Sequence, residues 1–113
     1  MDTKLNIALV GFGKFGKKYH KNILENKKLI LKKIYRKKNY SNKIFEKLSD
    51  KSIKINRIQS AIIVTPVKTH YKIAKYFIKK NIPIILEKPA AHTLGEIKKL
   101  LVYSQKKKSF CIS

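Results

Sequence analysis

Three glycines in the pattern G-x-G-x-x-G place the strongest constraint on how this chain can fold. They are Gly11, Gly13 and Gly16. They follow the apolar run Leu5–Val10, and from Lys14 onward the apolar residues recur at a helical spacing. A short apolar run closed by glycines is typical of a buried strand. The pattern therefore predicts a strand, a tight glycine turn and a helix in direct succession.

Further apolar runs predict more strands. The run within 58–66 is continuous and β-branched, which indicates a strand buried on both faces, as in a parallel sheet. Turn residues and prolines separate these runs from one another. The predicted strands cover 29–35, 58–66, 82–89 and, as a short closing stretch, 109–113.

Helices are predicted between these strands, because the apolar residues there form stripes with a helical period. In the short segment 41–50, Ile44, Phe45 and Leu48 are expected to face inward from a helix. The alternation of strands and helices predicts an α/β fold, a doubly wound parallel sheet (Rossmann-like), as a single domain over 1–113. The predicted helices begin at Lys14, lie within 41–50, cover Thr69–Lys80, and follow a capping box of Thr93 and Glu96.

The large net charge of the chain does not by itself identify a specific partner. The net charge is +22, and it comes from 28 basic residues of which only Arg36 and Arg57 are arginines. The lysines are scattered over the whole length, so they attract any polyanion, and more weakly as salt rises. Proteins that read specific bases rely heavily on arginine. We therefore expect no specific nucleic-acid partner.

The sequence also lacks membrane and disulfide signals. No apolar run approaches the roughly 18 residues of a membrane span, and the first residues do not have the pattern of a signal peptide. A single cysteine, Cys111, cannot form a disulfide framework within the chain or a cysteine-rich zinc site. We expect a cytoplasmic protein with no membrane partner and no metal site, in which Cys111 fills core space.

The glycine loop suits the phosphates of a dinucleotide. Gly11 permits a tight turn, Gly13 lets the backbone approach a pyrophosphate, and Gly16 lets the helix pack close to the strand. The start of the helix then presents free N–H groups and a partial positive charge to the anion. A glycine turn that binds no ligand is the alternative. The predicted cofactor-binding residues of this loop are Gly11, Phe12, Gly13, Lys14, Phe15 and Gly16.

The residues after the second predicted strand bear on which dinucleotide binds. NAD-binding proteins place Asp or Glu there for the ribose 2′-hydroxyl, whereas NADP-binding proteins place Arg near the 2′-phosphate. Here Arg36 and Lys37 follow the strand, and no acidic residue lies between Glu25 and Glu46. Arg36 can bind a phosphate through two hydrogen bonds and can stack on adenine. This favours NADP, with NAD as the alternative because lysine is abundant throughout the chain.

Two further motifs follow the glycine loop in the sequence. Thr65 and Pro66 end the third predicted strand and are followed by His70, and the letters EKP at 87–89 end the fourth. With the glycine loop, these motifs occur in the order found in the N-terminal NAD(P)-binding domain of the Gfo/Idh/MocA oxidoreductase family. The chain resembles that domain over nearly its whole length.

The resemblance implies a role for each motif. Thr65 and Pro66 lie against the ribose and adenine side of the cofactor, and Glu87 contacts the nicotinamide ribose. Lys88 points at the nicotinamide and the substrate and is the implied catalytic residue, because a lysine there stabilises a developing oxyanion. His70 is a further implied cofactor contact, with local packing or helix capping as the alternative.

The resemblance also implies that a part is missing. Family members are much longer, and their second domain carries the substrate contacts. We therefore expect the cofactor-binding part of an oxidoreductase that acts on a sugar, polyol or related carbonyl compound. It would be truncated at its C-terminal end, inactive alone, and completed by a second subunit or the missing C-terminal domain. The alternative is a non-catalytic dinucleotide-binding module with a regulatory or subunit-pairing role.

Overall fold

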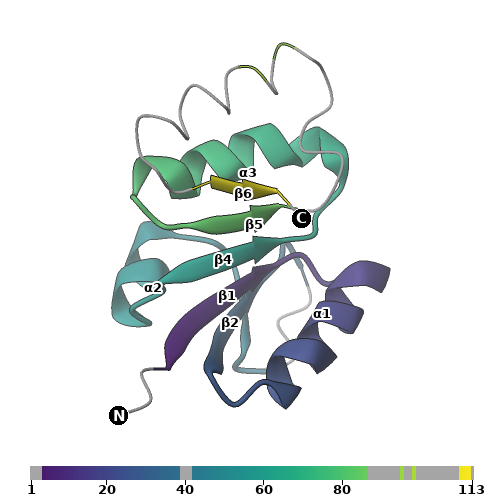
Figure 1. Ribbon diagram of the computed structural model, residues 1–113, viewed down its shortest axis with the longest axis vertical. Helices are drawn as coiled ribbons and strands as arrows, with labels where there is room; N and C mark the ends of the chain where they lie inside the picture. Colours follow the sequence, from purple (N-terminus) through teal and green to yellow (C-terminus); the bar gives the residue numbers. More distant parts are fainter. Residues whose placement is uncertain (1–3, 39–41, 87–94, 96–97, 99–109, 113) are drawn as a thin grey trace.

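The strand before the glycine loop lies at the centre of the molecule (Figure 1). The computed structural model describes residues 4–38, 42–86, 95, 98 and 110–112. In chain order the elements are β1 (Leu5–Val10), α1 (Lys14–Glu25), β2 (Leu29–Tyr35), β3 (Phe45–Glu46), α2 (Asp50–Ile55), β4 (Ser60–Ile63), α3 (Val67–Lys79), β5 (Ile84–Leu86) and β6 (Phe110–Ile112).

The strands form one parallel sheet in the order β3-β2-β1-β4-β5-β6. The chain moves outward from β1 through β2 and β3, returns to β4, and moves outward again on the other side. Between β1 and β4 the strand order therefore reverses, and ligands of doubly wound sheets bind beyond the carboxyl ends of the strands at such a point. The predicted fold class is confirmed.

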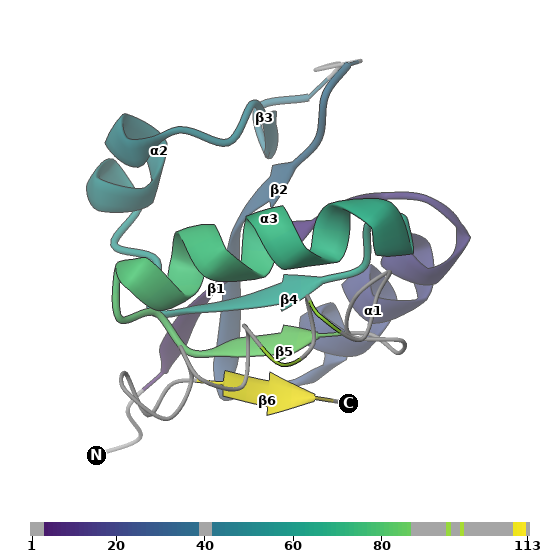
Figure 2. The same ribbon diagram turned by 90° about the horizontal axis from the view of Figure 1, so that it is seen from above.

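Hydrophobic clusters cover both faces of the sheet, so alternate residues of a strand belong to different clusters. Ala8 and Val10 pack with residues of α2 and α3, whereas Ile7 and Leu9 pack with Ile23 of α1. Figure 2 shows α3 running alongside β4. The position of α1 on the opposite face from α3 makes the sheet doubly wound.

The helix predicted within 41–50 is wrong. Phe45 and Glu46 form the edge strand β3, in which Phe45 pairs with Ile34 of β2. The Arg36 N–H donates to the Glu46 carbonyl oxygen at 3.0 Å. Because β3 adds a strand that the sequence did not predict, the sheet has six strands where five were expected.

The helix of this region begins later, at Asp50. The Ser49 hydroxyl oxygen accepts a hydrogen bond from the Ser52 N–H at 3.1 Å, which makes Ser49 the N-cap of α2. In the rest of the described chain, β1, β2 and the start of α1 lie where they were predicted, whereas β4 is shorter than the predicted strand. Helix α3 begins at Val67, two residues before the predicted start.

The prediction of a closing strand is confirmed by β6. Of the helix predicted after Thr93, only Gly95 and Lys98 are described, and both are helical. The rest of that helix lies outside the described residues, as does the side chain of Cys111.

Asp50 links α2 to α3. Its Oδ1 accepts a hydrogen bond from the Tyr76 hydroxyl and lies 2.8 Å from the Lys80 Nζ. Lys80, and after it the Tyr76 hydroxyl, hold the pKa of Asp50 below its ordinary value. Burial, and after it the same contact with Asp50, raises the pKa of Tyr76, so its hydroxyl remains a donor.

We expect Asp50→Asn to lower the free energy of unfolding modestly at neutral pH. A carboxyl whose pKa is lowered on folding stabilises the folded state above its unfolded pKa of about 3.9. That stabilisation is lost as the pH falls through the lower folded pKa, so wild type and variant should converge in acid. Urea unfolding from neutral pH to about pH 2 measures this, with Glu25→Gln as the control for loss of one exposed charge. A difference that stays constant down to the lowest pH would contradict it.

Candidate dinucleotide-binding site

Three loops meet at the carboxyl ends of the central strands. The Gly11 N–H donates to the Tyr35 carbonyl oxygen at 2.8 Å, which ties the glycine loop to the end of β2. The Val64 N–H donates to the Val10 carbonyl oxygen at 2.9 Å, which ties the segment after β4 to the end of β1. The loops after β1, β2 and β4 therefore leave the sheet side by side.

Gly11 and Gly16 are required by close backbone packing. Gly11 has a φ of +102°, which strongly favours glycine. A Cβ on Gly11 would lie 3.0 Å from the Thr65 Cγ2 and 3.1 Å from the Val64 carbonyl carbon. A Cβ on Gly16 would lie 2.8 Å from the Gly11 carbonyl oxygen. These two glycines thus let α1 pack directly against the loop and the segment after β4.

Gly13 differs from its neighbours because the fold itself leaves room for a side chain there. It is exposed, it is the N-cap residue of α1 with a φ of −83°, and no atom lies within 4 Å of the position that its Cβ would take. The first N–H groups of a helix have no partner within the helix, and the first turn of α1 has no acidic residue. The open space at Gly13 fits an anion such as a pyrophosphate.

The Arg36 guanidinium rests on two phenylalanine rings. Its Cζ lies 4.9 Å from the ring centre of Phe45 and 5.6 Å from that of Phe12. The two rings meet edge to face, with 5.0 Å between their centres. We call Phe12, Arg36 and Phe45 the arginine stack. Because Phe12 belongs to the glycine loop, the stack holds a positive charge beside that loop.

The acid nearest to the stack in the sheet faces away from it. The Glu46 Oε1 lies 3.4 Å from the Lys33 Nζ. A hydrogen bond with Ser52, and also Lys33, hold the pKa of Glu46 below its ordinary value. Glu46 is therefore a carboxylate with partners of its own, and none of the described carboxylates forms an ion pair with Arg36.

Tyr35 occupies the last position of β2, and its side chain is buried. Its hydroxyl oxygen lies 2.9 Å from the Ser52 hydroxyl oxygen. Burial raises the pKa of Tyr35, and the negative charge of Glu46 adds to that rise, whereas the hydrogen bond with Ser52 opposes it. Tyr35 thus joins the end of β2 to α2, on the opposite face of the sheet from Arg36.

The turn after β4 is held by the first turn of α3. The His70 Nε2 lies 2.7 Å from the Thr65 carbonyl oxygen, and the His70 side chain is buried. The Thr69 hydroxyl oxygen lies 2.7 Å from the Thr65 hydroxyl oxygen and 2.6 Å from the Pro66 carbonyl oxygen. These contacts give His70 a place in the turn itself, which is the local-packing interpretation, and its contact with a cofactor stays a prediction.

The remaining predicted site residues are placed only in part. Lys14 is the exposed first residue of α1, and Lys37 is exposed beside Arg36. Phe15 lies in the first turn of α1, but its side chain is outside the description. Glu87 and Lys88 also lie outside the described residues, although β5, which they follow, ends beside β4 at the same edge of the sheet.

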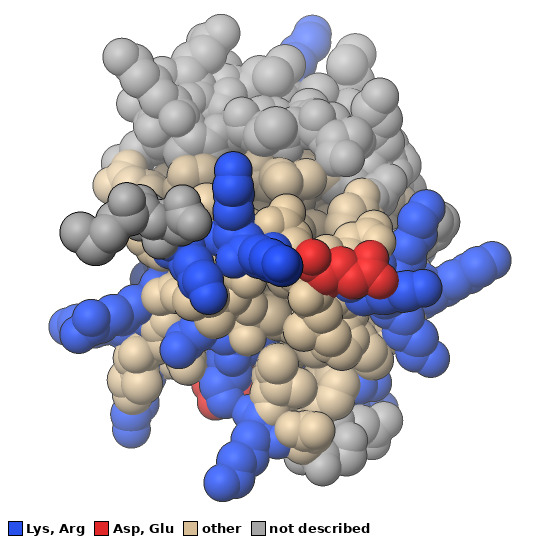
Figure 3. Space-filling model, turned by 60° about the horizontal axis from the view of Figure 1, so that its bottom comes forward, with Lys and Arg blue, Asp and Glu red and all other residues tan. Residues whose placement is uncertain are grey.

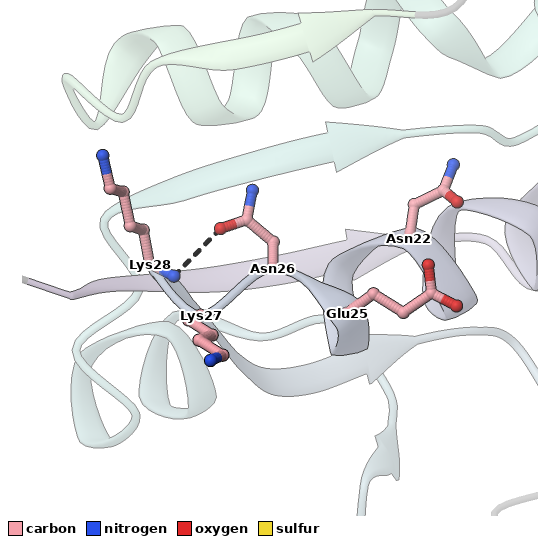
Figure 4. Close-up of a pocket in the computed structure, with 5 residues that line it drawn as sticks. All are labelled: Asn22, Glu25, Asn26, Lys27 and Lys28. Carbon is pink, nitrogen blue, oxygen red and sulfur yellow. Dashed lines mark hydrogen bonds between the residues drawn. The ribbon is translucent and has the colours of Figure 1, made fainter.

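A surface hollow at the other end of α1 is not part of this site. It is lined by Asn22, Glu25, Asn26, Lys27 and Lys28 (Figure 4). The Lys28 N–H donates to the Asn26 Oδ1 at 2.9 Å within it. The hollow lies where α1 ends and turns into β2, whereas the glycine loop lies where α1 begins.

Basic side chains are spread over the face of the molecule that Figure 3 shows. In Figure 3, lysine and arginine side chains project from many parts of the visible face, and the acidic groups are few.

Among the described residues, no His, Cys, Asp and Glu side chains form a group of three or more that could hold a metal ion. None of the helices in the described part of the chain has the length and apolar character to cross a membrane.

Comparison with known proteins identifies the fold and the family. Residues 5–113 match the Gfo/Idh/MocA family, described as an oxidoreductase family with an NAD-binding Rossmann fold. No curated protein sequence matches the chain.

Several solved structures share the fold. GenD2 from gentamicin A biosynthesis, in complex with NAD, has a TM-score of 0.89 and 17% identity over 98% of this chain and 34% of its own. An oxidoreductase from Bacillus cereus has a TM-score of 0.81 and 27% identity over 96% of this chain and 34% of its own. The apo scyllo-inositol dehydrogenase from Lactobacillus casei has a TM-score of 0.86 and 18% identity over 99% of this chain and 37% of its own.

This chain thus spans about a third of the length of the solved structures that it matches. The family match covers the glycine loop, the arginine stack and the turn after β4 together. The chain belongs to the Gfo/Idh/MocA oxidoreductase family and corresponds to its NAD-binding Rossmann domain.

Proposed function

We propose that this chain is the cofactor-binding part of an NADP-dependent oxidoreductase. The observation that carries the proposal is the arginine stack beside the open space at Gly13. A guanidinium and the amino end of a helix stand next to each other at the switch point of the sheet. Both groups favour phosphate, and NADP carries phosphate at two places, so the proposal assigns the helix end to the pyrophosphate and the guanidinium to the 2′-phosphate.

The proposed site divides along the cofactor. The first turn of α1 binds the pyrophosphate, with Gly13 giving it access and Lys14 adding positive charge. Thr65 and Pro66 line the ribose and adenine side, and His70 holds their turn in place. Arg36 and Lys37 bind the 2′-phosphate.

The charges around β2 support NADP over NAD. An NAD site presents a carboxylate that accepts hydrogen bonds from the ribose 2′-hydroxyl. Here Glu46 already pairs with Lys33, and the hydroxyl of Tyr35 is engaged by Ser52. Arg36 has no carboxylate partner among the described residues. GenD2 is solved with NAD, and so NAD stays the alternative that binding experiments must exclude.

The chemistry supplied by the bound cofactor is hydride exchange at the nicotinamide. By the family motif, Glu87 contacts the nicotinamide ribose and Lys88 stabilises negative charge on the substrate oxygen. The similarity in fold to scyllo-inositol dehydrogenase supports a polyol, a sugar or a related carbonyl compound as the substrate class. We further propose that this chain binds the dinucleotide without activity alone, because it spans only a third of the solved structures that it matches.

We expect the chain to bind NADPH saturably at physiological salt, and more tightly than NADH. Gly13→Asp should abolish binding, whereas Gly13→Asn should weaken it less. Asp and Asn have the same shape and both are good N-cap residues, so the pair differs chiefly in the charge placed beside the pyrophosphate. Nicotinamide fluorescence titrations measure the dissociation constants, and circular dichroism checks the fold.

Gly16→Ala is the structural comparison for this titration. Its Cβ would meet the Gly11 carbonyl oxygen, so we expect a loss of stability of about 1–3 kcal/mol, which neither Gly13 variant should show. Tighter binding of NADH than of NADPH would contradict the NADP assignment. Unchanged NADPH binding by Gly13→Asp would contradict the placement of the pyrophosphate.

We expect no turnover from the isolated chain. The rate of absorbance change at the nicotinamide band, measured with scyllo-inositol, D-galactose and related compounds, should not exceed the rate without protein. The same preparation must bind NADPH in the titration, so that inactivity cannot be attributed to a damaged site. Steady turnover by a chain shown to be pure and monomeric would refute the need for a second domain or subunit.

A further inference from the structure

We propose that Phe45, on the edge strand β3, is a positioning residue that sets the preference for NADPH by holding Arg36. This inference rests on the proposed function, since it concerns the same 2′-phosphate. It adds a residue that is separated in sequence from the glycine loop and that lies in a segment where the sequence predicted a helix.

The backbone brings Phe45 to Arg36. Phe45 pairs with Ile34 in the β2–β3 ladder, and the next bond of the ladder joins the Arg36 N–H to the Glu46 carbonyl oxygen at 3.0 Å. Both residues of the contact are therefore fixed to the same pair of strands. Of the two rings in the arginine stack, Phe45 lies closer to the guanidinium, at 4.9 Å from its Cζ.

The rings hold Arg36 without using up its charge. A ring attracts a cation through its face, whereas the N–H donors of a guanidinium lie in the guanidinium plane. Among the described residues no carboxylate pairs with Arg36. A phosphate therefore meets an arginine that is held by two rings and whose positive charge is not neutralised by any carboxylate of the described residues.

The energetic consequence differs between the two cofactors. A free arginine side chain loses rotamer freedom when it binds a phosphate, and the arginine stack removes part of that loss before binding. Only the cofactor with a 2′-phosphate gains from this preorganisation. Phe45 should thus affect the dissociation constant for NADPH and leave that for NADH nearly unchanged.

The competing explanation is that Phe45 is only a core residue. Its ring packs against the hydrophobic cluster that contains Leu9 and Ile34. If packing were its whole role, replacing the ring would loosen β3 and weaken NADPH and NADH binding alike. The ratio of the two dissociation constants separates the two explanations, because a purely structural defect leaves it unchanged.

The test measures that ratio in wild type, Phe45→Leu, Phe45→Tyr and Tyr76→Leu. Phe45→Leu should lower the NADPH preference by about three- to tenfold, the range that a cation–π contact supports. Phe45→Tyr keeps the ring face and should keep the preference. The matched control is Tyr76→Leu on α3, because the Tyr76 ring centre also lies 4.9 Å from a cation, the Lys80 Nζ.

A second comparison ties the effect to Arg36. In an Arg36→Leu background, Phe45→Leu should change the NADPH preference no further, because the side chain that it positions is gone. Should Phe45→Leu fail to fold, Phe45→Met removes the ring with a more flexible side chain that adapts to the space, and makes the same test. An equal effect of Phe45→Leu in both backgrounds would refute the positioning role.

The outcomes separate this inference from the proposed function. A wild-type chain that shows no preference for NADPH contradicts the NADP assignment, and this inference fails with it. A wild-type chain that prefers NADPH, with the full preference kept in Phe45→Leu, overturns the role of Phe45 and leaves the NADP assignment standing. Loss of preference in Phe45→Leu but not in Phe45→Tyr or Tyr76→Leu supports both.

Discussion

The site depends on the close approach of α1 to the loop after β1. At Gly16 a single added carbon would meet the Gly11 carbonyl oxygen at 2.8 Å, and at Gly11 it would meet Thr65 and Val64. Interiors are packed too densely to absorb such a carbon without a shift. These two missing side chains place the amino end of α1 over the switch point of the sheet. The open position at Gly13 lies between these two tightly packed glycines.

The pleat of β2 separates two kinds of polar chemistry at the end of the strand. Tyr35 points to one face and joins Ser52 beside the carboxylate of Glu46, whereas Arg36 follows on the other face against Phe12 and Phe45. A one-residue shift in register would exchange the faces and place the arginine beside the acid. The alternation of the strand thus keeps the carboxylate of Glu46 away from the positive charge of Arg36.

The sequence predicted those parts of the fold whose signals are local. The glycine spacing after an apolar run predicted β1, the loop and α1, and continuous apolar runs predicted β2, β4 and β5. The prediction for the segment 41–50 was wrong because a two-residue strand is too short to show alternation. In addition, Ile44, Phe45 and Leu48 fit the apolar stripe of a helix. Pairing with β2, which lies outside that segment, decides the outcome there. A local signal was nevertheless present for α2, in Ser49 at a capping position before Asp50.

The candidate site was predictable by residue type but not by contact. The basic pair after β2 could be recognised from the sequence alone, whereas the arginine stack requires β3 to be in place. The positions of the expected site residues along the chain also bear on function. The residues proposed to bind the phosphates follow β1 and β2, whereas the residues expected at the nicotinamide follow β5. Phosphate contacts supply binding energy without touching the reacting atoms, and catalysis requires interactions that strengthen in the transition state. The proposed cofactor binding and the proposed lack of turnover are therefore compatible within one chain.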